Sequence, residues 1–155
     1  MARLAIATPR DVRLLDRGLS VGEALAAFNA VSPQAGGIVS FVGKVRPDTD
    51  VRALEITHYE PLTLPGIEDR AGEASERFGL DGLLAWHRIG TMVPGEAIVL
   101  VAAAATHRRD AFAAVDFMMD HLKAGAWFWK RERRSDGWHW IEPRQGDYED
   151  LDRWN

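Results

Sequence analysis

The chain has 155 residues, of which 46% are hydrophobic and 27% are charged, a composition typical of a folded domain and unlike that of a disordered or fibrous protein. It contains no cysteine, which excludes a disulfide framework, a cysteine-ligated zinc site, an iron–sulfur cluster and a thiol nucleophile. Because the chain has no thiol, any sulfur chemistry needs a sulfur atom that another molecule brings. The net charge of −4 argues against general binding of nucleic acid or anionic membranes.

The apolar segments are short. The longest run, Ala97–Ala105, cannot span a bilayer, and charged residues near the N-terminus occupy the place of a signal peptide's apolar core. No internal repeat, low-complexity tract or long linker divides the chain. We therefore expect a cytoplasmic protein with a single domain over residues 1–155.

The first half of the chain predicts two helices and two strands. Ser20 and Glu23 have the spacing of a capping box, which predicts that a short helix begins there. A β-branched strand follows at residues 38–42, and a polar turn at residues 47–50 comes after it. Residues 54–59 alternate with period two, whereas residues 63–78 have helical spacing of their apolar positions.

The second half predicts four more strands and a third helix. Residues 83–89 and 97–105 predict strands that pair antiparallel across a turn at Pro94 and Gly95. Thr106 is the predicted N-cap of a helix that ends at Gly125. Residues 127–132 and 138–142 flank a turn and predict a hairpin, and an acidic surface tail follows from about residue 148. Helices interleaved with hairpin-connected strands favour an α+β fold with a mixed or antiparallel sheet.

Cations occur at the predicted start of the third helix. His107 and Arg108 follow Thr106 directly, although a helix N-terminus ordinarily favours acidic side chains. The backbone amides of the first helical turn have no partner within the helix and point out of its N-terminus. Together with these amides, the two side chains could bind a phosphate or a carboxylate. The alternative is that Asp110 and solvent neutralise them, with Arg109 as the more solvated arginine.

A local basic segment contains two lysines of interest. Residues 121–146 hold six Lys or Arg against three Asp or Glu, although the whole chain is acidic. Lys123 stands at a helix C-terminus, where the helix dipole favours a cation for structural reasons alone. Lys130 stands among aromatic and cationic residues, which would lower its pKa and suit proton transfer or nucleophilic attack. The alternative for Lys130 is a strand lysine with a solvated head group.

Other familiar site patterns are missing or have a structural explanation. The five histidines show no metal-ligand spacing, so we expect no metal site, and no phosphate loop, nucleophile elbow or dinucleotide fingerprint occurs. The tryptophans at 127, 129, 138 and 140 alternate, which places each pair on one face of its strand. A core or a subunit interface explains them better than base stacking.

Several motifs, taken together and in order, resemble the large, catalytic subunit of molybdopterin synthase. They are Phe41-Val-Gly-Lys-Val-Arg46, His87-Arg-Ile-Gly90, Pro94-Gly-Glu96, Thr106-His-Arg108 and residues 119–132, Met-Asp-His-Leu-Lys-Ala-Gly-Ala-Trp-Phe-Trp-Lys-Arg-Glu. The resemblance implies an α/β hammerhead-type fold with an additional antiparallel β subdomain. It also implies a homodimer within a heterotetramer, in which a small ubiquitin-like (MoaD-type) sulfur-carrier subunit docks at each distal end.

The resemblance also implies a reaction. The carrier's C-terminal Gly-Gly thiocarboxylate enters a pocket and donates sulfur to cyclic pyranopterin monophosphate, which forms the dithiolene of molybdopterin without a cofactor of the chain's own. The family's pocket lysines fall on Lys123 and Lys130, and its anion-binding residues on Arg46, His107 and Arg108. Lys130 is then an acid/base or a transient nucleophile, and Lys123 stabilises the carboxylate charges. Arg144 matches an arginine that the family contributes across the dimer interface.

The chain departs from the family pattern at Trp127, where proline is usual, and at Gly125, where a larger residue is frequent. Two other function classes stay open. A non-catalytic assembly subunit would use the tryptophan hairpin to dimerise and would tolerate loss of Lys130. A nucleic-acid-binding module would use the basic segment and the tryptophans, with a steep dependence on salt.

Overall fold

The computed structural model describes residues 9–125 and 127–155, so residues 1–8 and 126 lie outside the description. Across the described residues the chain forms eight strands and four helices. The strands are β1 (Arg10–Leu15), β2 (Gly37–Lys44), β3 (Ala53–His58), β4 (Gly82–Arg88), β5 (Gly90–Met92), β6 (Ala97–Ala105), β7 (Phe128–Arg134) and β8 (Gly137–Ile141). The helices are α1 (Val21–Ala30), α2 (Thr63–Arg77), α3 (Arg108–Ala124) and α4 (Gln145–Asp152).

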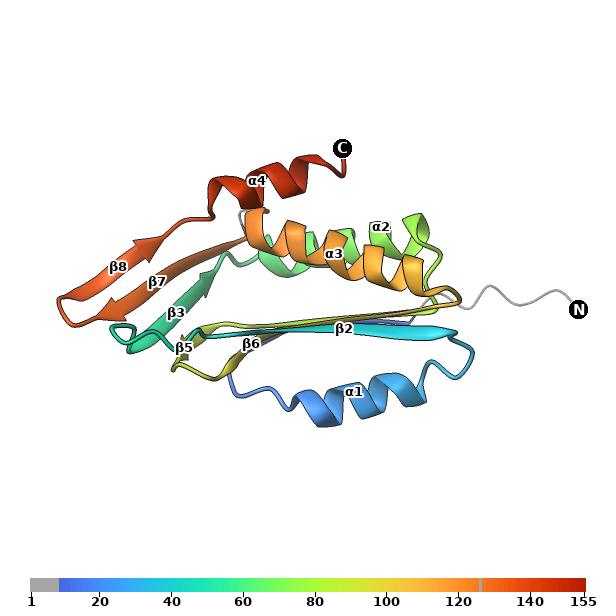
Figure 1. Cartoon of the computed structure of the whole chain (residues 1–155), viewed down its shortest axis with the longest axis horizontal. Coiled ribbons are helices and arrows are strands. Elements are labelled where there is room, and N and C mark those ends of the chain that lie inside the picture. Colours follow the sequence, from blue (N-terminus) through green and yellow to red (C-terminus); the bar gives the residue numbers. More distant parts are fainter. Residues whose placement is uncertain (1–8, 126) are drawn as a thin grey trace, which may run out of the picture.

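Two four-stranded sheets organise these elements. The first has the order β1-β4-β6-β2 and is mixed, because β1 runs parallel to β4 while the other pairs are antiparallel. The second has the order β5-β3-β7-β8 and is antiparallel throughout. Figure 1 shows α2 and α3 on one face of the first sheet and α1 on the other, with the second sheet projecting at one end. The α+β prediction with an added antiparallel sheet is confirmed.

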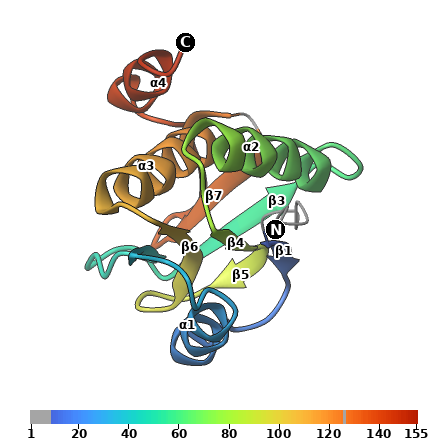
Figure 2. The same cartoon turned by 90° about the vertical axis from the view of Figure 1, so that its right-hand side faces the viewer.

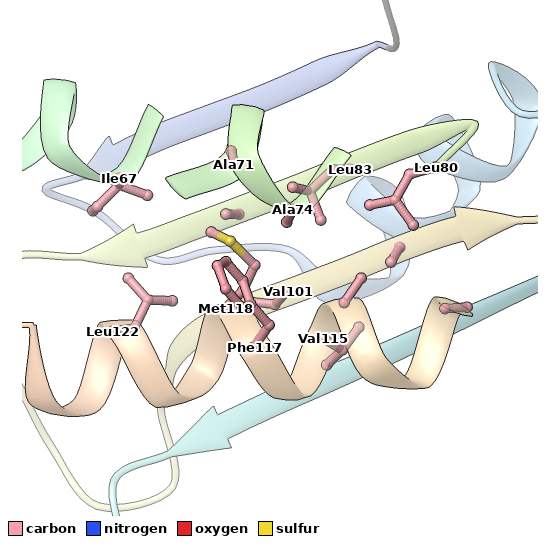
Figure 3. Packing of buried hydrophobic residues seen from close by; sticks show 14 of the residues in the cluster. Ile67, Ala71, Ala74, Leu80, Leu83, Val101, Val115, Phe117, Met118 and Leu122 are labelled. Atoms are coloured by element: carbon pink, nitrogen blue, oxygen red, sulfur yellow. The ribbon is translucent and has the colours of Figure 1, made fainter. Parts of the chain in front are cut away.

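The main core lies between the first sheet and the two long helices. Viewed end-on, α2 and α3 lie side by side above the sheet (Figure 2). The β6 strand is buried along most of its length because helices cover both of its faces, and so its sequence is a continuous apolar run. Phe117 and Met118 of α3 point into the layer between helix and sheet, as Figure 3 shows, and both are fully buried.

A smaller cluster ties the second sheet to the first. It contains Val45, Leu54, Ile56 and Met92. Ile98 and Phe128 pack against both this cluster and the main core. The two sheets therefore share a continuous apolar interior, which supports our proposal that the described residues form one domain.

The N-terminal half agrees with the sequence in most elements. The first helix begins after Ser20, although no side-chain hydrogen bond caps it, so the predicted capping box is wrong in its chemistry. The sequence did not predict β1, a short edge strand. The turn after Val93 forms as expected, with Gly95 at a φ of 93°. However, the residues before this turn form β5 and join the second sheet, so β4 and β6 pair antiparallel without a direct hairpin.

The predictions for the aromatic hairpin and the tail need correction. The strands β7 and β8 form the expected hairpin, but Trp127 precedes β7 and packs against the main core, beside Gly66 of α2. Trp127 and Trp129 therefore do not share a strand face. The C-terminal segment is not merely a surface tail, because it forms α4 and then inserts Trp154 against Phe78 and Phe117. The acidic composition of this segment did not indicate that one partly buried tryptophan anchors it.

The burial of Phe117 makes a testable difference from an exposed apolar residue. We expect Phe117→Ala to lower the free energy of unfolding by about 3–5 kcal/mol, since a large cavity would remain. The control is Leu62→Ala, whose side chain is 60% exposed and should change stability by no more than about 0.5 kcal/mol. Urea unfolding of the three proteins measures both values. Equal losses in the two variants would contradict this packing.

Candidate active site

Lys130 lies on the apolar side of the second sheet. Its neighbours in register are Ile56 on β3 and Ile141 on β8, which share its face because directly opposed residues of antiparallel strands point the same way. Phe128, two residues earlier on β7, belongs to the same face. The alternation of β7 thus turns Lys130 inward and Trp129 and Arg131 outward.

The surroundings of Lys130 change its acidity. Burial, together with the nearby positive charge of Lys123, lowers the pKa of Lys130 to about 8, even though the carboxylate of Asp147 acts in the opposite direction. Lys123 itself lies exposed in the last turn of α3. The two lysines predicted from the sequence are therefore close enough to influence each other, and the expected depression of the Lys130 pKa is confirmed in direction.

His87 is a neighbour of the lysines that the sequence analysis gave no role. Its ring is buried and stacks on Phe128, with the ring centroids 4.0 Å apart. Its Nδ1 hydrogen-bonds the Arg88 carbonyl at 2.7 Å. Burial, with a smaller contribution from the charge of Lys130, lowers the pKa of His87 to about 3. A neutral ring thus forms an uncharged wall of the lysine site at physiological pH.

Arg46 is held by the backbone of a neighbouring turn. The preceding residue, Val45, is buried in the smaller cluster, donates its N–H to the Glu96 carbonyl and accepts from the Gly95 N–H, both at 2.9 Å. The Glu96 side chain accepts from the Val93 N–H at 2.7 Å and pairs with the buried Arg88 at 3.3 Å. Arg46 therefore emerges from a fixed position at the end of β2, beside the cluster that Lys130 lines.

His107 and Arg108 lie far from the lysines of the same chain. His107, not Thr106, is the N-cap of α3, so that prediction is wrong by one residue. The cause is that the β2–β6 contact continues past β6, where the Gly36 N–H binds the Ala105 carbonyl and the Gly36 backbone lies tightly against Thr106. From His107 to Lys123 the helix rises roughly 24 Å at 1.5 Å per residue. Both cations of the N-terminus are exposed.

Arg144 and Asp147 form the beginning of α4. Arg144 is the N-cap, donates its backbone N–H to Asp147 Oδ2 at 2.9 Å and places its guanidinium 3.6 Å from Asp147 Oδ1. Its side chain is 83% exposed, whereas that of Asp147 is only 14% exposed. The sequence analysis missed Asp147, although an acidic residue three positions after an N-cap is a recognisable capping signal.

The polar turn at residues 47–50 is tied to the hairpin. Asp50 accepts a hydrogen bond from the Ser135 N–H at 3.3 Å and lies 3.7 Å from the Arg134 guanidinium. These contacts hold the turn against the tip of β7 and β8. Among the described residues, no group of three or more His, Asp or Glu side chains could hold a metal ion, and no helix is both long and apolar enough to cross a membrane.

The structure thus gathers some predicted site residues and separates others. The end of the first sheet, where the second sheet begins, carries Lys123, Lys130 and Arg46. Asp147 acts on Lys130 and also pairs with Arg144, so Arg144 belongs to the same end of the molecule. His107 and Arg108 lie at the opposite end of α3, at the right of Figure 1. A single chain therefore holds a lysine site at one end and a cationic helix start at the other.

Comparisons with known proteins agree with one another. Residues 14–125 match the family described as MoaE protein. The molybdopterin synthase catalytic subunit of Caulobacter vibrioides is 42% identical, over 93% of this chain and 97% of the relative. The MoaE structure from Burkholderia ambifaria has a TM-score of 0.80 at 39% identity and covers 94% of this chain and 97% of that one. Molybdopterin synthase from Staphylococcus aureus has a TM-score of 0.75 at 26% identity, over 83% and 94% of the two chains.

The buried neutral His87 should make the fold sensitive to acid. Its folded pKa of about 3 lies below the ordinary value of 6.5, so between these limits the unfolded chain binds a proton that the folded chain does not. Stability should therefore fall as the pH falls through this window, by about 1.4 kcal/mol per pH unit from His87 alone. Urea unfolding at pH 6, 5 and 4 should show a shallower loss for His87→Gln than for the exposed control His107→Gln. Parallel losses in both would contradict the assignment.

Proposed function

The chain belongs to the MoaE family, and from this premise we propose that it acts as the catalytic subunit of a molybdopterin synthase. It transfers sulfur from the C-terminal thiocarboxylate of a small ubiquitin-like carrier subunit to cyclic pyranopterin monophosphate. The chain has no cysteine, which is consistent with sulfur arriving on the carrier. We place this reaction in the cytoplasm.

The observation that carries the proposal is the lysine pair. With a pKa of about 8, Lys130 is neutral in about one tenth of the molecules at pH 7, compared with about one in three thousand for an ordinary lysine. Such an amine can accept a proton or attack a carbonyl and can also return a proton. Lys123 lies near the same point, where a lysine cation would stabilise the thiocarboxylate and the carboxylate left after sulfur transfer.

The remaining predicted residues require a second protomer. His107 and Arg108 are separated from Lys123 by the full length of α3, so they cannot join the lysine pocket of their own chain. A substrate phosphate nevertheless fits the start of a helix with two added cations. We propose that these residues complete the lysine pocket of the partner in a homodimer. The dimer's two pockets then follow from its two-fold symmetry.

The open edge of β2 offers the geometry for such a dimer. The β2 strand ends the order of the first sheet, and Phe41 on β2 and Phe112 on α3 are both exposed at this side. Antiparallel pairing of two β2 edges about their midpoint would set the Lys44 end of one strand against the Gly37 end of the other. The Gly37 backbone lies against Arg108, so this pairing carries Arg108 of the partner subunit toward Arg46.

The cations then have separate roles in this proposal. Arg46 and the partner subunit's His107 and Arg108 bind the substrate phosphate. Lys123 and Lys130 face the sulfur that is transferred. Arg144 is a further substrate contact, and the family resemblance assigns it to the neighbouring protomer. In each chain the Arg144 guanidinium pairs with its own Asp147 at 3.6 Å, but its side chain is 83% exposed and can also contact a neighbouring protomer.

The reaction can be tested directly. Purified protein, thiocarboxylated carrier and cyclic pyranopterin monophosphate should yield molybdopterin, measured as its fluorescent oxidised derivative. We expect Lys130→Ala to abolish product because the only amine with a strongly depressed pKa among the described lysines is lost. The control Arg133→Ala removes an exposed cation from the same strand and should retain activity.

The outcomes separate the function classes. If both Lys130→Ala and the wild type form product, the chain is a molybdopterin synthase subunit but Lys130 has no essential role in its mechanism. No product from the wild type, despite carrier binding, would favour a non-catalytic assembly subunit. Salt-sensitive binding of single-stranded oligonucleotides without product would favour the nucleic-acid module.

The shared pocket makes a second prediction. Lys130→Ala and Arg108→Ala should each be inactive alone, but a mixture of the two that has exchanged subunits should recover about one quarter of wild-type activity. Half of the dimers are then mixed, and each mixed dimer has one pocket with both changes and one with neither. If all the residues of a pocket came from one chain, the mixture would stay inactive. Mass spectrometry of the mixture verifies that subunits have exchanged.

A further inference from the structure

The C-terminal helix carries one carboxylate that is turned inward. None of the residues of α4 is buried, and yet the Asp147 side chain is only 14% exposed. Figure 1 shows α4 lying along the half of α3 that ends at Lys123. The end of the molecule that carries Lys123 and Lys130 is therefore covered by a helix whose Asp147 carboxylate faces it.

Contacts beyond the end of α4 hold this helix in place. Arg153 donates to Asp116 and Asp120 of α3, both at 2.8 Å. The indole N–H of Trp154 donates to the same Asp120 carboxylate at 2.7 Å. The Trp154 ring packs edge-on against Phe117, with centroids 5.4 Å apart. This anchor fixes α4 along the helix that carries Lys123.

The direction of α4 brings Asp147 to the lysines. The helix starts near the C-terminal end of α3 and runs back toward the anchor, so the two helices are antiparallel (Figure 1). Arg153 contacts Asp120 of α3, and Asp147 lies six residues before Arg153, a rise of roughly 9 Å at 1.5 Å per residue. Because the helices are antiparallel, a rise of roughly 9 Å from Asp120 along α3 goes past Lys123 to the end of that helix. Asp147 therefore lies alongside the last turn of α3, near the start of β7.

The electrostatics of the site agree with this placement. The Asp147 carboxylate raises the pKa of Lys130, against burial and against the charge of Lys123. The other charged or titratable groups near this point are Arg144, which pairs with Asp147, and His87, which is buried and neutral. Asp147 is thus the acidic group set against two lysines.

We propose that Asp147 is a positioning residue for Lys130: the C-terminal helix, fastened by Arg153 and Trp154, holds its carboxylate beside the two lysines, where it stabilises the protonated amine of Lys130. Without this carboxylate, burial and the charge of Lys123 would act unopposed, and the protonated form of Lys130 would be less populated. The consequence for sulfur transfer rests on the proposed function. The effect on Lys130 itself does not.

The composition of the chain makes the effect measurable. Its only lysines are Lys44, Lys123 and Lys130, so reductive methylation with 13C-formaldehyde gives three side-chain NMR signals. Lys→Arg variants assign each signal. In the full-length protein we expect Asp147→Asn to shift the Lys130 titration to lower pH than in the wild type. Asparagine can still accept the Arg144 N–H, so the cap is preserved while the charge is removed.

The matched control is Asp150→Asn, which removes the same charge from an exposed position of the same helix and should leave the Lys130 titration unchanged. Trp154→Ala releases the anchor without removing the carboxylate and should shift the Lys130 titration in the same direction as Asp147→Asn. An unchanged Lys130 titration in Asp147→Asn would overturn the proposal, and so would an equal shift in Asp150→Asn.

Activity separates this inference from the proposed function. If Asp147→Asn shifts the Lys130 titration and the pH dependence of product formation shifts in the same direction, both the role of Asp147 and the proposed function are supported. If the titration shifts in Asp147→Asn but the wild type makes no molybdopterin, Asp147 keeps its role and the proposed reaction is wrong. If the wild type makes product while the Lys130 titration ignores Asp147, the reaction stands and this inference is wrong.

Discussion

The packing of α3 on the first sheet sets the geometry on which the rest of the molecule depends. Its inner face, with Phe117 and Met118, is buried in the main core, where the buried residues that the strands contribute are all aliphatic. A helix packed in this way is a rigid rod, because protein cores are dense and resist sliding. Its two ends therefore keep a constant separation. One end presents His107 and Arg108, and the other end presents Lys123.

That separation gives the proposed dimer a physical reason. If one site needs both the start and the end of α3, it cannot close within one chain, but a partner related by a two-fold axis can bring its own helix start to the helix end of the first chain. The open edge of β2 and the exposed Phe41 lie where such a partner would dock. An edge strand left unpaired is otherwise a liability for a protein. Dimerisation would then serve stability and catalysis through the same contact.

The lysine end shows how three elements together set the acidity of one amine in a chain that has no cysteine. An inward position on a strand buries the amine of Lys130, a second lysine adds repulsion, and a carboxylate from the C-terminal helix limits the effect. The neutral ring of His87 forms an uncharged wall and brings no competing proton at physiological pH. Each contribution comes from a different element: β7, α3, α4 and β4.

The sequence by itself determined the α+β class and nearly all of the long elements, and it predicted the two lysines as site residues, because periodicity, turn residues and local charge are properties of neighbouring positions. It failed at β1 and at α4, where short elements are stabilised by distant contacts such as those of Trp154. Only the tertiary structure decided that β5 leaves the first sheet, that Asp147 and His87 adjoin Lys130, and that His107 and Arg108 lie apart from the lysines. These facts depend on which elements meet in space, and local patterns carry no information about partners far along the chain.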